Sequence, residues 1–454
     1  MKRILAGSLL DYNMEPLQDL GIGNLRLNVP HLLGQSANFD HDTPIMIDDT
    51  QLERIEGVAR PTGGISDEGP AEFVLPPMGD TFLMMGSMYL YSKLQIQTEG
   101  GTMIEDTDVV APVNLLGATM WESIETSVDD VTISGSSGNF VNYKAMIESL
   151  LSYEAGTKTS HMRTQFFHPD TAGAYDDFGN ADTDKNKGFK TRYGWSGKNV
   201  FDMVAPINSD LVKADTHLKA GRKLTLKFFK ARDNFLLCSD VNKNFRLRVI
   251  DLKLFYHRLR LRPDMKISPR ERYVFTQTNL KRYPLPAGLE YFNTSIQRDG
   301  KIPKTIVIGM VKTAAAEGTY ATNPFCFEPF KLSQICLSVG GKRVPSEPLQ
   351  PDFESGLLSR EYAHLFINTG GYRVDRSNCV TLDQFKNGMT LFPFDLSPDL
   401  CNQAHVHPSP VSHVELELHW SEALAAPITI FVYMSFEAVL TRKSGELDFT
   451  REII

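Results

Sequence analysis

Short runs of apolar or alternating residues, separated by Gly, Pro, Asn and Asp, dominate the chain from Ala71 onward. Examples are KLTLKFF (223–229), KTIVIGMV (304–311) and ITIFVYMSFEAVL (428–440). The segment His413–Trp420 alternates most regularly, with Val, Leu, Leu and Trp on one face and His, Glu, Glu and His on the other. This period of two predicts a half-buried antiparallel strand, and the close spacing of the runs predicts a β-sandwich or barrel.

Helical periodicity is convincing in only two segments, NYKAMIESLLSY (142–153) and SGLLSREYAHLF (355–366). Apolar side chains recur there at intervals of three or four residues, as expected of helices with one buried face. Each segment follows a predicted strand and precedes a long polar stretch. This shared position prompts a search for an internal repeat.

The search finds four pairs of similar segments in the same order. They are SIETSVDDVTISGS (123–136) with SQICLSVGGKRVP (333–345), FDMVAPINSDL (201–211) with FDLSPDL (394–400), KLTLKFF (223–229) with ELELHW (415–420), and FRLRVIDLKLFYHRL (245–259) with ITIFVYMSFEAVLTR (428–442). The offset falls from about 210 to about 192 residues because the loop after the first helix is the longer one, and loops tolerate such differences. The sequence therefore predicts one β-rich unit present twice.

Three regions follow from this repeat. Residues 1–70 are rich in Asp, Gly and Pro and lack sustained periodicity, which is typical of an arm. Pro263 and Pro269 interrupt the strands between the two copies. We therefore predict an N-terminal arm at 1–70, a first domain at 71–265 and a second domain at 266–454.

Composition narrows the class of protein. The 454 residues are too many for one ordinary core, and 42% of them are hydrophobic, as in a well-buried globular protein. The net charge of −8 argues against a surface built throughout to hold nucleic acid. Five cysteines without CxxC spacing predict reduced intracellular thiols. The apolar run near the start of the sequence is too short for a secretory signal peptide, and no apolar run is long enough for a membrane span. We therefore expect a cytosolic or nuclear protein.

The motifs inside the repeat resemble those of the double jelly-roll major capsid proteins of Polinton/Maverick elements and adintoviruses, the hexon-like group. From about Glu72 to the end, the resemblance is carried in the family's order by EFVLPPMGDTFLMMGSMYLYSKLQI (72–96), NYKAMIESLLSYEAGTKTSHM (142–162), NPFCFEPF (323–330), VPSEPLQPDF (344–353) and FDLSPDL (394–400). The segment NLLGATMWESIETSVDD (114–130) is more polar than the family's stretch at that place, and residues 1–70 match poorly.

The resemblance implies an all-β chain of two tandem eight-stranded jelly rolls with short helices in long loops. It also implies a structural protein without enzymatic activity or cofactor, which forms homotrimers of pseudo-hexameric outline that tile an icosahedral shell. Its partners would be neighbouring capsomers, penton and minor capsid proteins. The protein would be located in the virion capsid, which would be assembled in the host nucleus or cytoplasm. A β-sandwich module that binds a receptor or carbohydrate is the alternative, and a cupin-like enzyme would need a His/Glu metal set that the sequence does not supply.

Residues 243–272 hold ten basic side chains against three acidic ones. The candidate contact patch in this stretch consists of Arg246, Arg248, Arg258, Arg260 and Arg262. Alternating arginines also keep a sheet edge soluble, so we favour contact with a neighbouring subunit or with solvent over weak contact with packaged DNA.

Three other patterns invite a ligand-binding interpretation, and each has a simpler one. His405, His407, His413 and His419 are close in sequence, but the last two lie roughly 20 Å apart along one strand and cannot share a metal there. Asp182, Asp184, Asn186 and Gly188 start like a calcium loop, although the glycine is one position late and Tyr193 replaces the bidentate glutamate, so a solvated loop is favoured. Gly340, Gly341, Lys342 and Arg343 lack the spacing of a phosphate-binding loop and predict a hairpin turn.

Overall fold

The computed structural model describes residues 51–453, except 66–68, 106, 135–139, 180–184, 198, 215, 241–242, 265–270, 376, 401–407 and 443–449. Residues 1–50 of the predicted arm therefore lie outside the described residues. Strands hold 47% of the described residues and helices 16%, so the predicted all-β class is confirmed.

The first β-rich unit consists of two antiparallel four-stranded sheets. The strands of one sheet, in spatial order, are β1 (Gln51–Ala59), β10 (Phe245–Leu261), β3 (Thr81–Thr98) and β7 (Phe201–Pro206). Those of the other are β2 (Ala71–Leu75), β8 (Leu224–Lys230), β5 (Trp121–Val128) and β6 (Val131–Ser134). Apolar side chains on alternate positions of both sheets, such as Phe73, Leu94 and Phe228, are almost fully buried and form the core.

The second unit has the same construction. One sheet contains β11 (Glu271–Leu285), β18 (Ile428–Arg442), β13 (Thr305–Lys312) and β16 (Leu391–Asp395), with β19 (Thr450–Ile453) paired to the end of β18. The other contains β12 (Tyr291–Lys301), β17 (Val411–Trp420), β14 (Leu332–Val339) and β15 (Lys342–Leu349). On β17, Val414, Leu416, Leu418 and Trp420 are buried and the alternate residues half-buried, which confirms the predicted strand.

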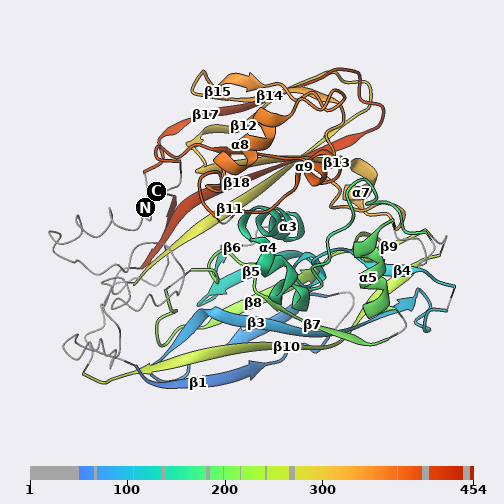
Figure 1. Ribbon diagram of the computed structural model, residues 1–454. Coiled ribbons are helices and arrows are strands. Elements are labelled where there is room, and N and C mark those ends of the chain that lie inside the picture. Colours follow the sequence, from blue (N-terminus) through green and yellow to red (C-terminus); the bar gives the residue numbers. More distant parts are fainter. Residues whose placement is uncertain are drawn as a thin grey trace, which may run out of the picture.

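The two units have identical strand connectivity. When the eight strands of each unit's two main sheets are counted in chain order, one sheet of each unit has the order first, eighth, third, sixth. The other has the order second, seventh, fourth, fifth. This is the arrangement of an eight-stranded jelly roll. Figure 1 shows the two jelly rolls one above the other, with the sheet of β11, β13 and β18 turned toward the first jelly roll.

Three of the four pairs of repeated segments fall on equivalent strands. In the remaining pair, FDMVAPINSDL begins at the start of β7, whereas FDLSPDL begins at the end of the equivalent strand β16. The β5–β6 hairpin corresponds to the β14–β15 hairpin, β7 to β16, β8 to β17 and β10 to β18. In the β14–β15 hairpin, Gly340 and Gly341 have φ values of 56° and 81°. Two consecutive positive φ angles are required by a two-residue type I′ turn, so the predicted hairpin turn is confirmed.

The predicted arm extends too far along the chain. Residues 51–59 are the first strand of the first jelly roll and pair with β10 along their length. Among the described residues this strand has a neighbour on one side only, and its side chains Glu53, Arg54 and Glu56 are exposed. An edge strand needs few apolar residues. Its polar sequence, QLERIEGVA, therefore resembled a linker although it completes a sheet.

Helices occupy the connections between strands. The two predicted helices are present as α3 (Val141–Ser152) and α8 (Ser359–Ile367). The others are α2 (Leu116–Thr119), α4 (Ala155–Thr159), the 3₁₀ helix η2 (His161–Gln165), α5 (Lys187–Ser196), α6 (Asp233–Leu236), α7 (Thr313–Glu317) and α9 (Leu382–Lys386), and the short strands β4 (Val110–Pro112) and β9 (Leu237–Ser239) pair with each other. Among the described residues, no helix has the length and apolar character needed to cross a bilayer.

Candidate functional site

Helix α3 lies between the two jelly rolls (Figure 1). Nine of its twelve residues are buried, including the charged Lys144. The ring of Tyr143 stacks on Phe431 of β18, with ring centres 3.8 Å apart, and its hydroxyl donates to the carbonyl oxygen of Pro324 at 2.9 Å. Burial raises the pKa of Tyr143. The helix is therefore part of the contact that holds one jelly roll against the other.

A buried ion pair joins α3 to the loop after β7. The side chains of Lys144 and Asp210 are 2% and 4% exposed, and the ammonium group donates directly to the carboxylate. The same carboxylate accepts from the backbone N–H of Thr278 on β11 at 3.0 Å and from its hydroxyl at 2.8 Å. Burial alone would lower the pKa of Lys144, but the adjacent Asp210 carboxylate outweighs that effect and raises it. Asp210 thus links both jelly rolls through groups shielded from water.

Glu148 makes a second link from the same helix. Its carboxylate accepts from the Lys213 ammonium at 2.6 Å and from the Tyr433 hydroxyl of β18 at 3.0 Å. Burial opposes ionisation, but Lys213 and Lys144 together lower the pKa of Glu148 below its usual value. A carboxylate that stays charged can hold the tyrosine and the lysine at the same time.

Arg192 of α5 is completely buried and organises the long loop of the first jelly roll. Its guanidinium donates to the Pro112 carbonyl and to Asp170, both at 2.7 Å. Asp170 also accepts from the side-chain amides of Asn186 and Asn323, each at 2.9 Å. Asn323 belongs to the second jelly roll, so this cluster is a further polar link between the two units.

Asn186, one of the residues of the calcium-loop pattern, belongs to this cluster. Asn186 caps α5 by accepting from the backbone N–H of Phe189 at 3.2 Å, and its amide also donates to the Ala174 carbonyl at 2.9 Å. Gly188 packs so closely on the backbone of Pro169 that a Cβ atom would overlap it. Asp182 and Asp184 lie outside the described residues. Asn186 and Gly188 therefore have structural roles at the start of a helix.

The five arginines of the basic stretch occupy different environments. Arg248 is exposed on β10, and Arg246 is half-buried on the same strand. Arg258 is only 3% exposed and donates to the Pro76 carbonyl at 2.6 Å, so it adds no charge to the surface. Arg260 and Arg262 pair with Glu53 at 2.6 Å and with Asp264 at 2.9 Å. The part of the predicted patch that is exposed on the N-terminal half of β10 is thus the stretch around Arg248.

One β-bulge in β10 explains this separation. Between Val249 and Asp251, which pair with Leu94 and Lys93, β10 has one residue more than β3, whereas at the second register shift, between Phe255 and His257, the extra residues lie in β3. A bulge inserts an unpaired residue and changes which side chains of a strand face the core. Arg258 therefore points inward although it lies an even number of residues from Arg248.

The predicted histidine group does not form a cluster in the described part of the chain. His413 pairs with Glu415 at 2.9 Å and His419 with Glu417 at 3.0 Å on the half-buried outer face of β17. His405 and His407 lie outside the described residues. Among residues 51–453 with the stated gaps, no group of three His, Cys, Asp or Glu side chains is arranged to hold a metal ion.

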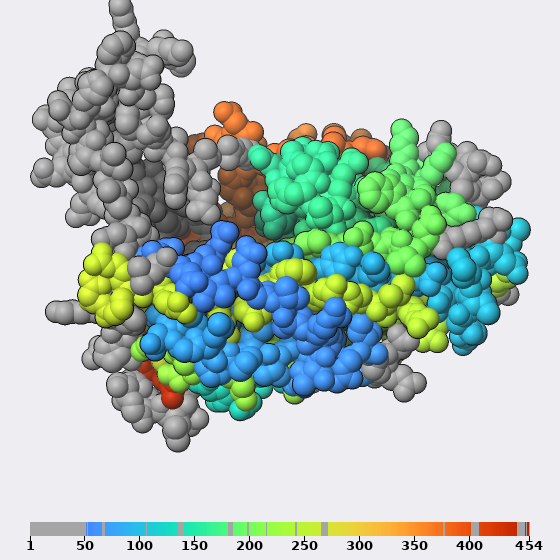
Figure 2. Space-filling model, turned by 90° about the horizontal axis from the view of Figure 1, so that it is seen from below, coloured from blue at the N-terminus to red at the C-terminus, as the bar shows by residue number. Residues whose placement is uncertain are grey.

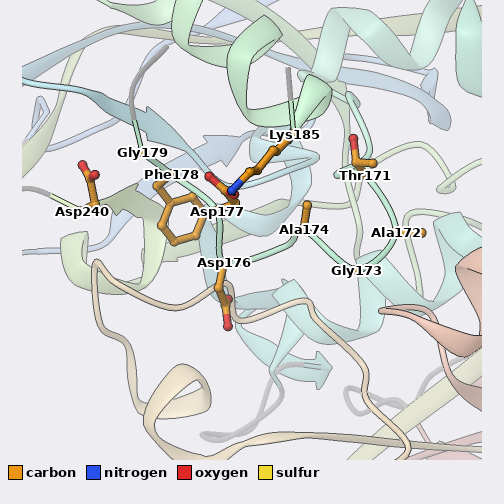
Figure 3. A pocket seen from close by; sticks show the side chains of 10 residues that line it. All are labelled: Thr171, Ala172, Gly173, Ala174, Asp176, Asp177, Phe178, Gly179, Lys185 and Asp240. Atoms are coloured by element: carbon orange, nitrogen blue, oxygen red, sulfur yellow. The ribbon is translucent and has the colours of Figure 1, made fainter. Parts of the chain in front are cut away.

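An open hollow of about 660 Å³ lies beside the long loop of the first jelly roll. Figure 3 shows its lining, in which Lys185 is directed toward Asp177; the two charged groups are 3.3 Å apart. Asp176 pairs instead with Lys312 at 2.9 Å. Asp176, Asp177 and Lys185 are thus paired within the chain, and the described lining residues give no pattern of catalytic groups.

Comparison with protein-family models finds no match. Among curated proteins, the uncharacterized protein F54H12.2 of Caenorhabditis elegans is 23% identical over 408 residues, which cover 85% of this chain and 93% of the nematode protein. Sequence similarity alone therefore gives no function.

Comparison with solved structures shows which proteins share the fold of this chain. A chain of the Sputnik virophage matches with a TM-score of 0.63 and 11% identity over 92% of both chains. The mavirus major capsid protein matches with a TM-score of 0.55 and 10% identity over 93% of this chain and 94% of that protein. The Faustovirus major capsid protein matches with a TM-score of 0.50 and 9% identity over 89% and 93%. The chain has the double jelly-roll fold found in viral major capsid proteins.

Proposed function

We propose that the protein is a structural major capsid protein, whose activity is self-assembly. The observation that carries this proposal is that both jelly rolls, and the polar links between them, belong to one chain that aligns with a virophage chain over 92% of each. The buried groups at these links, such as Asp210, which accepts from Thr278, and Asn323, which donates to Asp170, hold the two rolls in a fixed relative position. A shell-forming subunit needs such a rigid pair of similar units.

The assembly we propose is a homotrimer. Three chains of two similar jelly rolls present six similar edges, so a trimer has a pseudo-hexameric outline and can pack in a hexagonal array with repeated contacts. Many such trimers would tile an icosahedral shell with penton and minor capsid proteins as further partners. The location would then be the virion capsid, assembled in the host nucleus or cytoplasm.

We also propose descent from Polinton/Maverick elements or adintoviruses. The ordered motifs NPFCFEPF (323–330), VPSEPLQPDF (344–353) and FDLSPDL (394–400) support this origin. The similarity to a nematode protein over 93% of its length fits an integrated element, because such an element places its genes in an animal genome.

The division of the chain into two units is part of the proposal. We place the boundary between β10, which ends at Leu261, and β11, which starts at Glu271. We assign the exposed surface around Arg246 and Arg248 to contact with a neighbouring subunit. The local pairing of Arg260 and Arg262 favours this assignment over contact with DNA.

Size-exclusion chromatography with light scattering tests the proposal. We expect a stable particle with the mass of three 50.9 kDa chains, and electron microscopy should show a three-fold particle with a nearly hexagonal outline. A β-sandwich binding module would instead be a monomer. A strict monomer at every concentration would contradict the capsid proposal.

A further inference from the structure

Helices α3 and α8 occupy the same position in the repeat but differ in burial. Each lies in the connection between the fifth and sixth strands of its jelly roll. Nine of the twelve residues of α3 are buried, whereas only Glu361 and Leu365 of α8 are. The connection that contains α8 exposes five large apolar side chains: Leu357 (71%), Ile367 (40%), Tyr372 (57%), Val374 (57%) and Leu382 (43%). We call these five residues the α8 surface.

Strand β18 packs against α3, whereas its equivalent in the repeat, β10, has exposed side chains at the corresponding positions. On β18, the eighth strand of the second jelly roll, Phe431 and Tyr433 are 1% and 8% exposed because they pack against α3. The repeat aligns residues 245–259 of β10 with residues 428–442, which places Arg248 at the position of Phe431 and Ile250 at that of Tyr433. Arg248 is exposed and Ile250 is 40% exposed. We call Arg248 and Ile250 the β10 surface.

Strand β10, which carries the β10 surface, lies in the sheet on the side of the molecule away from the second jelly roll (Figure 1). Figure 2 shows this side, on which β1, β10 and β3 form one broad face. In the second jelly roll the equivalent face of β18 is turned toward α3 of the first (Figure 1). Within one chain, α3 packs against β18. The equivalent helix α8 and the equivalent strand β10 do not pack against each other in the chain, and their surfaces remain exposed.

We infer that the α8 surface of one copy packs on the β10 surface of the next copy, repeating between chains the contact that α3 and β18 make within one chain. This inference rests on the proposed trimer and specifies which surfaces close it. A head-to-tail contact of this kind forms a closed ring when the rotation between copies is right. Tyr372 and Asp375 lie in the exposed connection of α8, and an aromatic ring and a carboxylate are groups that an arginine such as Arg248 binds.

Two variants of the full chain test the contact from its two sides. Ile250→Glu places a charge in the β10 surface, and the double variant Leu357→Glu/Val374→Glu places charges in the α8 surface. Every interface of a ring needs both surfaces, so each variant should run as a monomer where the wild-type protein runs as three chains. Met103→Glu, at an apolar residue that is 59% exposed elsewhere, is the matched control and should remain a trimer.

Mixing the two monomeric variants gives the decisive result. A pair made of one copy of each variant still has one intact interface, so an equimolar mixture should yield a dimer that grows no further. Circular dichroism should show that both variants keep the wild-type spectrum and unfold cooperatively, with a melting temperature lowered only by the loss of the subunit contacts. Arg248→Glu serves as a second variant of the β10 surface.

Each failure has a different meaning. If the wild-type protein is a monomer, the proposed function fails. If the wild type is a trimer and a folded variant of either surface is also a trimer, the assignment of surfaces is overturned and the capsid proposal stands. Monomeric variants that form no dimer when mixed would show that the two surfaces do not meet each other.

Discussion

Lys144 and Asp210 form an ion pair that is almost completely removed from water, with side chains 2% and 4% exposed. The pair lies at the contact of the two jelly rolls, because Asp210 also accepts two hydrogen bonds from Thr278 of the second one. A buried carboxylate without a counter-charge is costly, so each member of this group depends on the others.

Replacing Lys144 with methionine should strongly destabilise the protein. The change removes the positive partner and leaves Asp210 charged and buried, which typically costs about 3–5 kcal/mol. Chemical denaturation of the full chain measures this destabilisation. Lys223→Met is the control, because Lys223 pairs at 2.6 Å with Asp130, which is 77% exposed, and breaking such a pair costs about 0–1 kcal/mol. Equal costs for the two variants would contradict the structural role of the buried pair.

Mildly acidic pH should weaken the fold through His364. Burial in α8, with a further contribution from Arg360, lowers the pKa of His364 from its usual 6.5 to about 4. Between these two values the unfolded chain binds a proton that the folded chain does not, so stability falls as pH falls from about 6.5 to about 4. Melting temperatures of the wild type and of His364→Phe, measured across this range, should show a smaller decline in the variant. Parallel curves would rule out His364 as a contributor.

Asn186→Ala should destabilise the long loop of the first jelly roll. The side chain of Asn186 caps α5 and bridges Asp170 and Ala174, so its removal leaves buried groups without partners, at a cost of about 1–3 kcal/mol. Hydrogen exchange should show faster opening of α5. Asn387→Ala is the control, since Asn387 bonds to Asp383 at the exposed end of α9. We expect this variant to change the hydrogen exchange of α9 little.

Sequence patterns predicted the parts of the fold that depend on local periodicity. The alternation in residues 413–420, the paired glycines at 340–341 and the helical spacing in 142–153 each correspond to the observed element. These features are set by side chains that are near one another in the chain, and the repeat reinforced them by presenting the same order twice.

Elements that depend on distant partners could not be predicted in this way. Strand β1 is polar because it lies at a sheet edge, and α5 is held by Arg192 and Asn186 rather than by an apolar stripe. Lys144 and Asp210 are 66 residues apart, and no spacing rule connects them. The inward position of Arg258 follows from the bulge in β10 between Val249 and Asp251, which becomes visible only when the partner strand is known.

The protein should show no detectable binding of duplex DNA, even at low salt. Arg258 is buried, and Arg260 and Arg262 already have carboxylate partners, so the basic stretch has few charges left to neutralise phosphates. The chain as a whole carries a net charge of −8. Fluorescence anisotropy with a labelled duplex should therefore show no binding at about 50 mM salt, a concentration at which non-specific electrostatic binding is strong. Tight binding that weakens steeply with added salt and is abolished by Arg248→Gln would contradict this expectation and assign the β10 surface to the genome, because salt weakens binding in proportion to the number of phosphates that basic side chains neutralise.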